Sequence, residues 1–184
     1  YNDDESVEWV MGQIHCGEER TVFDVPVDTH GISLVGWKNG VTGVLTTGLP
    51  NPVQDRLIGS EGIIENSTRM EVRMLRAGEA DWVVPELDPV DIPGRETTLY
   101  ILDAIEWLET GVESRTSSRK ALQTTEVIFA TYESSRRRGR VELPLTIDDS
   151  PLLSMLESGE IQIPDYPARL SDEEESEGYA LLFN

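Results

Sequence analysis

Few residues of this chain have side chains that are common in metal binding or catalysis. The histidines are His15 and His30, and the only cysteine is Cys16. His15 and Cys16 are adjacent, so in a strand their side chains point to opposite faces and cannot bind one metal ion together. His30 lies fifteen positions after His15, and no further histidine or cysteine is present to complete a zinc site. We therefore expect no metal site.

His30 is the one candidate for proton transfer. It follows Asp28, and a neighbouring carboxylate can hold an imidazole in one tautomer. The alternative, which we favour, is a polar residue that enters a strand. Carboxylate pairs such as Asp148 and Asp149 arise by composition in so acidic a chain, and Ser134 and Ser135 have no adjacent base that would make either a nucleophile.

No glycine-rich phosphate-binding motif is present. The sequence contains neither GxGxxG nor GxxxxGK[ST], and residues 59–62 offer only a tight turn between strands. We expect this chain alone to bind no nucleotide cofactor.

The composition is strongly acidic. The 184 residues include 35 Asp and Glu against 15 Lys and Arg, a formal net charge of −20. Such a surface repels nucleic acid and anionic membranes, and it is typical of halophilic proteins, which stay soluble in molar salt. The single cysteine and the lack of a long apolar run predict a cytoplasmic protein. Because Tyr1 rather than methionine comes first, we expect a segment of a longer protein.

The first half of the chain predicts strands. Apolar and β-branched runs indicate strands at 7–16, 32–37, 41–47, 53–58, from 63 onward, 70–75 and 81–84. Asn39-Gly40 lies between two of these runs and is the strongest short signal for a hairpin. Short turns throughout favour an antiparallel sheet.

The second half changes to a helical period. Leu99, Leu102, Ile105 and Leu108 predict a helix that ends at Gly111. A second helix starts at Ser117 or Ser118 and ends in residues 136–139, followed by a strand at 141–145. Residues 147–184 are expected to be an acidic tail, with a like-charge run at 171–177.

This order predicts an α+β fold: an open, mostly antiparallel sheet with two main helices packed on one face, formed by residues 1–146. The other face of the sheet stays free, and we expect a second copy of the chain to cover it, giving a homo-oligomer.

Residues 118–145 resemble the C-terminal signature of the glucose–fructose oxidoreductase / inositol dehydrogenase / MocA (Gfo/Idh/MocA) family. The matching positions are Ala130, Tyr132, Ser134, Gly139 and residues 141–144. Residues 57–64 (LIGSEGII), 37–43 (WKNGVTG) and 1–4 (YNDD) resemble further family segments, in the same order along the chain.

The resemblance implies a two-domain NAD(P)-dependent oxidoreductase that acts on a sugar or polyol hydroxyl. An N-terminal Rossmann domain would bind NAD or NADP, and the C-terminal domain would cover the substrate and join subunits. The family's catalytic lysine lies in a Glu-Lys-Pro motif, which this chain lacks, and its partner Asp and His lie on a helix that would end before Tyr1. No catalytic residue is therefore carried over, and His30, Asn51 and Gln54 are the candidates for lining the substrate.

The chain is thus expected to be inactive alone, as the substrate-side and oligomerisation domain of such an enzyme. The alternative is a self-standing, non-catalytic binding or assembly module.

Overall fold

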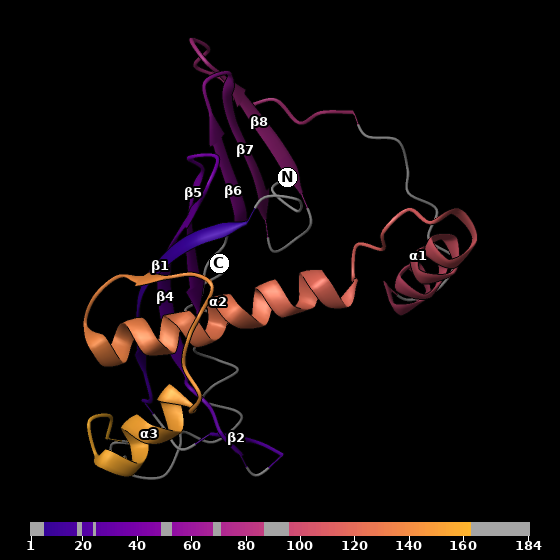
Figure 1. Ribbon diagram of the computed structural model, residues 1–184. Coiled ribbons are helices and arrows are strands. Elements are labelled where there is room, and N and C mark those ends of the chain that lie inside the picture. The colour runs from indigo at the N-terminus through magenta and orange to yellow at the C-terminus, as the bar shows by residue number, and fades with distance from the viewer. Residues whose placement is uncertain are drawn as a thin grey trace, which may run out of the picture. The chain divides into compact units, whose positions relative to one another are not determined.

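The computed structural model describes residues 6–17, 20–23, 25–48, 53–67, 71–86 and 96–162 (Figure 1). They fall into two compact units. The first unit comprises Tyr1–Gly48 and Leu122–Asn184, and the second comprises Leu49–Ala121.

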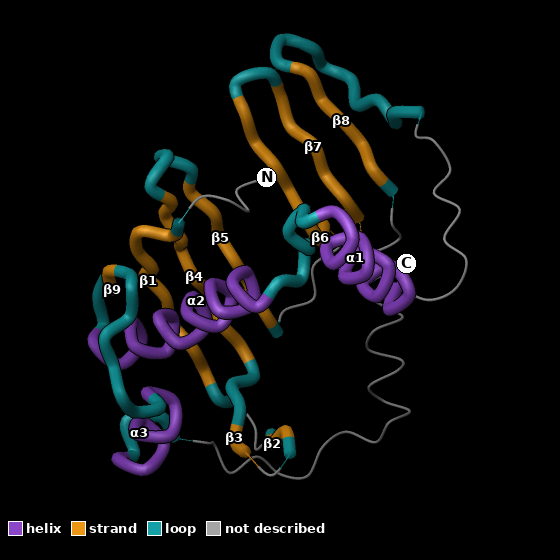
Figure 2. Tube along the Cα trace, turned by 45° about the vertical axis from the view of Figure 1, so that its right-hand side comes forward, coloured by secondary structure: helices purple, strands orange, loops and turns teal. Residues whose placement is uncertain are grey.

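The first unit is built on an antiparallel four-stranded sheet with the strand order β5-β4-β1-β9 (Figure 2). The strands are β1 (Val7–His15), β4 (His30–Trp37), β5 (Thr42–Thr47) and β9 (Val141–Glu142). The predicted hairpin at Asn39-Gly40 is confirmed: Gly40 has a φ of 86° in the turn from β4 to β5. A short ribbon of β2 (Thr21–Val22) and β3 (Val25–Pro26), which was not predicted, joins β1 to β4.

The alternation of β1 decides which side chains enter the core. Val10 and Ile14 are buried, whereas Met11 and His15 between and after them are exposed. Cys16 is also buried, so His15 and Cys16 do point to opposite faces, as expected from their adjacency.

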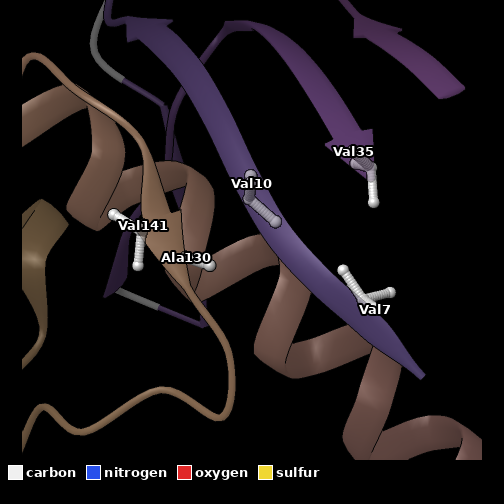
Figure 3. Packing of buried hydrophobic residues seen from close by; sticks show 5 residues of the cluster. All are labelled: Val7, Val10, Val35, Ala130 and Val141. Atoms are coloured by element: carbon white, nitrogen blue, oxygen red, sulfur yellow. The ribbon is translucent and has the colours of Figure 1, made fainter. Parts of the chain in front are cut away.

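Helix α2 (Ser118–Arg137) covers one face of this sheet (Figure 2). The core there consists of five buried residues from three strands and the helix, shown in Figure 3: Val7, Val10, Val35, Ala130 and Val141. Gly12 allows the close approach of the helix, because a Cβ at this position would lie 2.8 Å from Cγ2 of Thr131.

A third helix lies beyond the predicted ones. α3 (Pro151–Ser158) begins with proline in its first turn and ends at Gly159, whose φ is 75°. Leu152 and Met155 pack in a second buried cluster with Ile14 and Cys16. The acidic run at 171–177 lies outside the described residues.

The predicted strand at 141–145 is shorter in the structure. β9 ends at Glu142, and one further hydrogen bond runs from the Leu143 N–H to the carbonyl of Glu8 (2.9 Å). Pro144 follows and has no N–H to continue the ladder.

Beyond the end of β9, the hydroxyls of two serines of α2 accept hydrogen bonds from β1. β9 pairs only with Trp9 and Val10 of β1, so the next outward N–H groups, those of Gly12 and Ile14, have no strand beside them. The Ser134 hydroxyl accepts from the Gly12 N–H (2.8 Å) and donates to the carbonyl of Gly139 (2.6 Å). The Ser135 hydroxyl accepts from the Ile14 N–H (3.3 Å). Side chains thereby satisfy a strand edge that would otherwise be open to pairing.

The second unit contains a three-stranded antiparallel sheet with the order β6-β7-β8 and one helix. Its elements are β6 (Val53–Gly59), β7 (Gly62–Ser67), β8 (Val72–Arg76) and α1 (Glu96–Thr110). Glu65 on the central strand is buried between Arg56 and Arg73, which pair with it from the two flanking strands.

The predictions for this unit hold with one exception. Gly111, with a φ of 77°, follows the end of α1 as predicted. The predicted strand at 81–84 is wrong, because only an isolated bridge between Met74 and Val83 forms there, directly ahead of prolines that break the pattern. The α+β class with open antiparallel sheets is confirmed.

Removing the Ser134 hydroxyl tests the edge contact. In Ser134→Ala the N–H of Gly12 and the carbonyl of Gly139 both lose their partner, and we expect about 2 kcal/mol less stability toward urea unfolding. The matched control is Ser60→Ala, since Ser60 is exposed in a turn and should change stability by less than about 0.5 kcal/mol. Equal unfolding midpoints for the two variants would show that the contact does not stabilise the fold.

Candidate functional site

The three residues predicted to line the substrate lie in different places. His30 is the first residue of β4, in the first unit. Gln54 belongs to β6 of the second unit, and Asn51 lies outside the described residues. Their grouping into one site therefore stays a prediction, and only His30 has a described environment.

His30 is half-buried and stands beside the hydroxyl of Thr29, and no carboxylate among the described residues hydrogen-bonds to it. Its Nδ1 lies 3.0 Å from Oγ1 of Thr29. Asp28, which the sequence offered as the partner, instead accepts a hydrogen bond from the phenol of Tyr132 at Oδ1 (2.7 Å). Asp28 and His30 are two residues apart in an extended segment, and this spacing does not by itself bring their side chains into contact. Tyr132, in contrast, approaches Asp28 from α2.

The contacts of Thr29 define which nitrogen of His30 carries the proton. Oγ1 of Thr29 accepts from the Gly17 N–H (2.7 Å) and donates to the carbonyl of His15 (3.1 Å). The hydroxyl has a single proton, and when that proton goes to the His15 carbonyl, His30 Nδ1 donates to this oxygen. We infer that neutral His30 carries its proton on Nδ1 and its lone pair on Nε2.

This arrangement suits His30 for accepting a proton or a hydrogen bond. A hydrogen bond to one ring nitrogen fixes the ring and leaves the other nitrogen as the acceptor, which is how imidazoles are prepared for proton transfer or for binding a hydroxyl. Sequence reasoning named His30 but missed Thr29, because a threonine between Asp28 and His30 gives no signal until the register of β1 and β4 is known.

The register also places the second histidine opposite the first. His15 of β1 pairs directly with His30 of β4, and the centroids of their rings are 6.1 Å apart. His15 is exposed on the face of the sheet opposite α2. Fifteen residues separate the two in the sequence, so only the pairing of the strands brings them together.

Two other reactive groups near α2 are held in their protonated forms. Burial, and next the hydrogen bond to Asp28, raise the pKa of Tyr132 far above its usual value. Burial, and next the charge of Asp28, raise the pKa of the Cys16 thiol. Neither group is suited to act as a base or a nucleophile at neutral pH.

The face of the first sheet opposite α2, which we call the open face, is apolar at its centre. Met11, Leu34 and Val44 form one row across three strands, with Ile32 in the next row. Met11, Ile32 and Val44 are 52%, 51% and 64% exposed. A hollow of about 520 Å³ lies over these side chains, and Arg138 and Gly139 also line it.

Neither a dinucleotide nor a metal centre of the usual kind fits the described residues. Gly59 and Gly62 lie in a turn that joins β6 to β7 as a hairpin, whereas a phosphate-binding turn joins a strand to a helix. Within the described ranges, no three residues among His, Cys, Asp and Glu are grouped to hold a metal ion. No helix in the part of the chain that the structure describes is long and apolar enough to cross a membrane.

The tautomer of His30 can be measured directly. In ¹⁵N spectra of the histidine rings we expect the proton of neutral His30 on Nδ1, because Oγ1 of Thr29 accepts it. Thr29→Ser keeps the hydroxyl and should keep this tautomer, whereas Thr29→Val removes the acceptor and should release it. A His15→Gln variant assigns the two rings, and a proton on Nε2 of His30 in the unaltered chain would overturn the inference.

Similar structures exist, although no protein-family model and no curated protein matches the chain. The aldose–aldose oxidoreductase from Caulobacter crescentus, crystallised with glycerol, superimposes with a TM-score of 0.59 at 19% identity, over 76% of this chain and 42% of that chain. The WlbA dehydrogenase from Bordetella pertussis, in complex with NADH and UDP-GlcNAcA, gives 0.50 at 22% identity, over 77% of this chain and 41% of that chain.

An oxidoreductase from Agrobacterium radiobacter, in complex with NAD⁺, L-tartaric acid and magnesium, gives a TM-score of 0.53 at 17% identity, over 74% of this chain and 43% of that chain. The chain thus spans less than half the length of each of these three enzymes. Over about three quarters of its own length, the chain shares the fold of these oxidoreductase structures.

Proposed function

We propose that this chain is the C-terminal, substrate-side and oligomerisation domain of an NAD(P)-dependent oxidoreductase that acts on a sugar or polyol hydroxyl. The observation that carries the proposal is the fold match, which covers 76% of this chain but only 42% of the aldose–aldose oxidoreductase. The signature residues Ala130, Tyr132 and Ser134 support it independently, because that resemblance rests on the sequence alone.

In this proposal the cofactor is bound by a part of the enzyme outside the matched region. NADH and NAD⁺ are present in the neighbouring structures from Bordetella pertussis and Agrobacterium radiobacter. Such a cofactor needs backbone N–H groups at a glycine-rich turn that opens a helix, and this sequence lacks that motif. When bound, the cofactor would supply the hydride chemistry, and this chain would supply one wall of the substrate pocket.

His30 is the residue of that wall with the best-defined chemistry. Its Nε2 lone pair would accept a hydrogen bond from a substrate hydroxyl, since Thr29 holds the proton on Nδ1. Asn51 and Gln54 would add amide groups that bind further hydroxyls. A polyhydroxylated substrate suits such a set, because amides and a neutral imidazole each pair with hydroxyl groups without requiring a charge.

Assays of the isolated chain test whether the cofactor is bound by another part of the enzyme. We expect the 184-residue chain neither to bind NAD⁺ in calorimetry nor to reduce it with any of a panel of aldoses, cyclitols and polyols, because it has no dinucleotide site. A fusion to a Rossmann domain of a related oxidoreductase serves as the positive control for cofactor binding. Turnover of NAD⁺ by the 184-residue chain would refute the proposal, while failure of every longer form of the protein to bind NAD(P) would favour the binding or assembly module.

We also propose that a second copy of the chain covers the open face. Met11, Ile32 and Val44 are exposed beside the half-buried Leu34, and together they form an apolar patch on a sheet whose opposite face is covered by α2. The formal charge of −20 makes association of two copies unfavourable at low salt, so the interface would need screening, consistent with the halophilic, cytoplasmic setting that the composition predicts.

One charge at the centre of this face should separate the copies. We expect the chain to run as a dimer or larger oligomer by light scattering in about 2 M KCl, where screening acts within roughly 3 Å. Ile32→Asp should give a monomer of unchanged circular dichroism, because it places a carboxylate in the apolar patch. Leu122→Glu, an equally apolar and 68% exposed site on α2, is the matched control and should remain oligomeric. If the unaltered chain were a monomer by light scattering at high protein concentration, the proposal would be wrong.

A further inference from the structure

The pairing of His15 with His30 suggests a second use for the Nε2 lone pair of His30, as an alternative to the substrate hydrogen bond proposed above. The expectation of no metal site rested on the fifteen residues between His15 and His30. The register of β1 and β4 removes that separation, since the two residues are direct partners on adjacent antiparallel strands. Direct partners place their Cβ atoms about 5 Å apart on the same face of a sheet.

Both imidazoles lie at the end of the sheet, where they are accessible. His15 is exposed and His30 is half-buried, and their rings are 6.1 Å apart with planes inclined by 46°. Two imidazoles bound to one tetrahedral ion, with metal–nitrogen distances of about 2.1 Å, have centroids roughly 5 Å apart. A small rotation of the exposed His15 side chain closes this difference.

The second ring nitrogen of His30 is already held as it is in metal sites. Metal-binding imidazoles almost always donate their other N–H to an oxygen, which fixes the ring and the tautomer. His30 Nδ1 has Oγ1 of Thr29 at 3.0 Å, and this hydroxyl is itself held by the Gly17 N–H and the His15 carbonyl. With its proton on Nδ1, His30 has Nε2 left as the ligand atom.

We propose that His15 and His30 bind one divalent transition-metal ion of the kind that prefers imidazole, such as Zn²⁺, and so fasten the end of β1 to the start of β4. In the described part of the chain no third His, Cys, Asp or Glu joins them, so water completes the coordination. The formal charge of −20 concentrates cations around the chain and favours occupancy.

The test is a titration of the 184-residue chain with Zn²⁺ at about pH 7.5 in a large excess of Mg²⁺. Mg²⁺ occupies carboxylates, which prefer hard cations, and leaves imidazoles to Zn²⁺. We expect one Zn²⁺ per chain in calorimetry, with the ring resonances of His15 and His30 shifting together and His30 keeping its proton on Nδ1. Zn²⁺ that shifts neither ring, or only one of them, would overturn the proposal without any variant.

Variants give a second and independent answer. His15→Gln and His30→Gln should each weaken Zn²⁺ binding at least tenfold, whereas Gln13→Ala, which alters the neighbouring outward residue of β1 and keeps both imidazoles, should leave it unchanged. Zn²⁺ binding that survives in the double variant His15→Gln/His30→Gln would assign the metal to surface carboxylates and end the proposal. Neither result depends on whether the chain belongs to an oxidoreductase.

Discussion

The hydroxyl of Ser134 makes the contact on which the rest of the first unit depends. It accepts the N–H of Gly12 at the edge of β1 and donates to the carbonyl of Gly139 after α2, so it ties helix, strand and turn together at a buried point. That contact defines how α2 lies along the sheet. About one turn earlier in α2, the hydroxyls of Thr131 and Ser33 of β4 form a hydrogen bond. The phenol of Tyr132 donates a hydrogen bond to Asp28. Asp28 immediately precedes Thr29, whose hydroxyl orients His30. These contacts therefore link α2 to the segment that carries His30.

This chain of contacts gives physical meaning to the signature that the sequence shares with the Gfo/Idh/MocA family. Ala130 is fully buried where α2 meets the sheet, so a larger side chain would push the helix away. Tyr132 holds the segment that enters β4, and Ser134 closes the edge of β1. All three act in packing and hydrogen bonding. The signature therefore accounts for the fold, which the neighbouring structures share, and not for any contact with a substrate.

Local sequence patterns predicted most helices and strands, but not the contacts that depend on which strands pair. The alternation at 7–16, the Asn39-Gly40 turn and the period of α2 all depend on neighbours within a few residues, and each is confirmed. The His15–His30 pair and the contact of Thr29 depend on which strands meet, which no local pattern encodes. Helix α3 was not predicted, because Asp148, Asp149 and Pro151 suggested an acidic tail. Leu152 and Met155 are nevertheless three residues apart, as on one face of a helix, and both pack against Ile14. The candidates Asn51 and Gln54 rest on their position near strand ends and remain predictions.

The proposed function requires a cofactor-binding domain in the same protein, because this sequence lacks the glycine-rich dinucleotide motif. The most direct measurement is the sequence of the intact protein from its native cells, obtained by mass spectrometry of the polypeptide that contains these residues. The account predicts roughly 120 to 180 further residues before Tyr1, opening with a strand, a glycine-rich turn and a helix. An intact protein in which an initiator methionine directly precedes Tyr1 would contradict the account and leave an assembly module in its place.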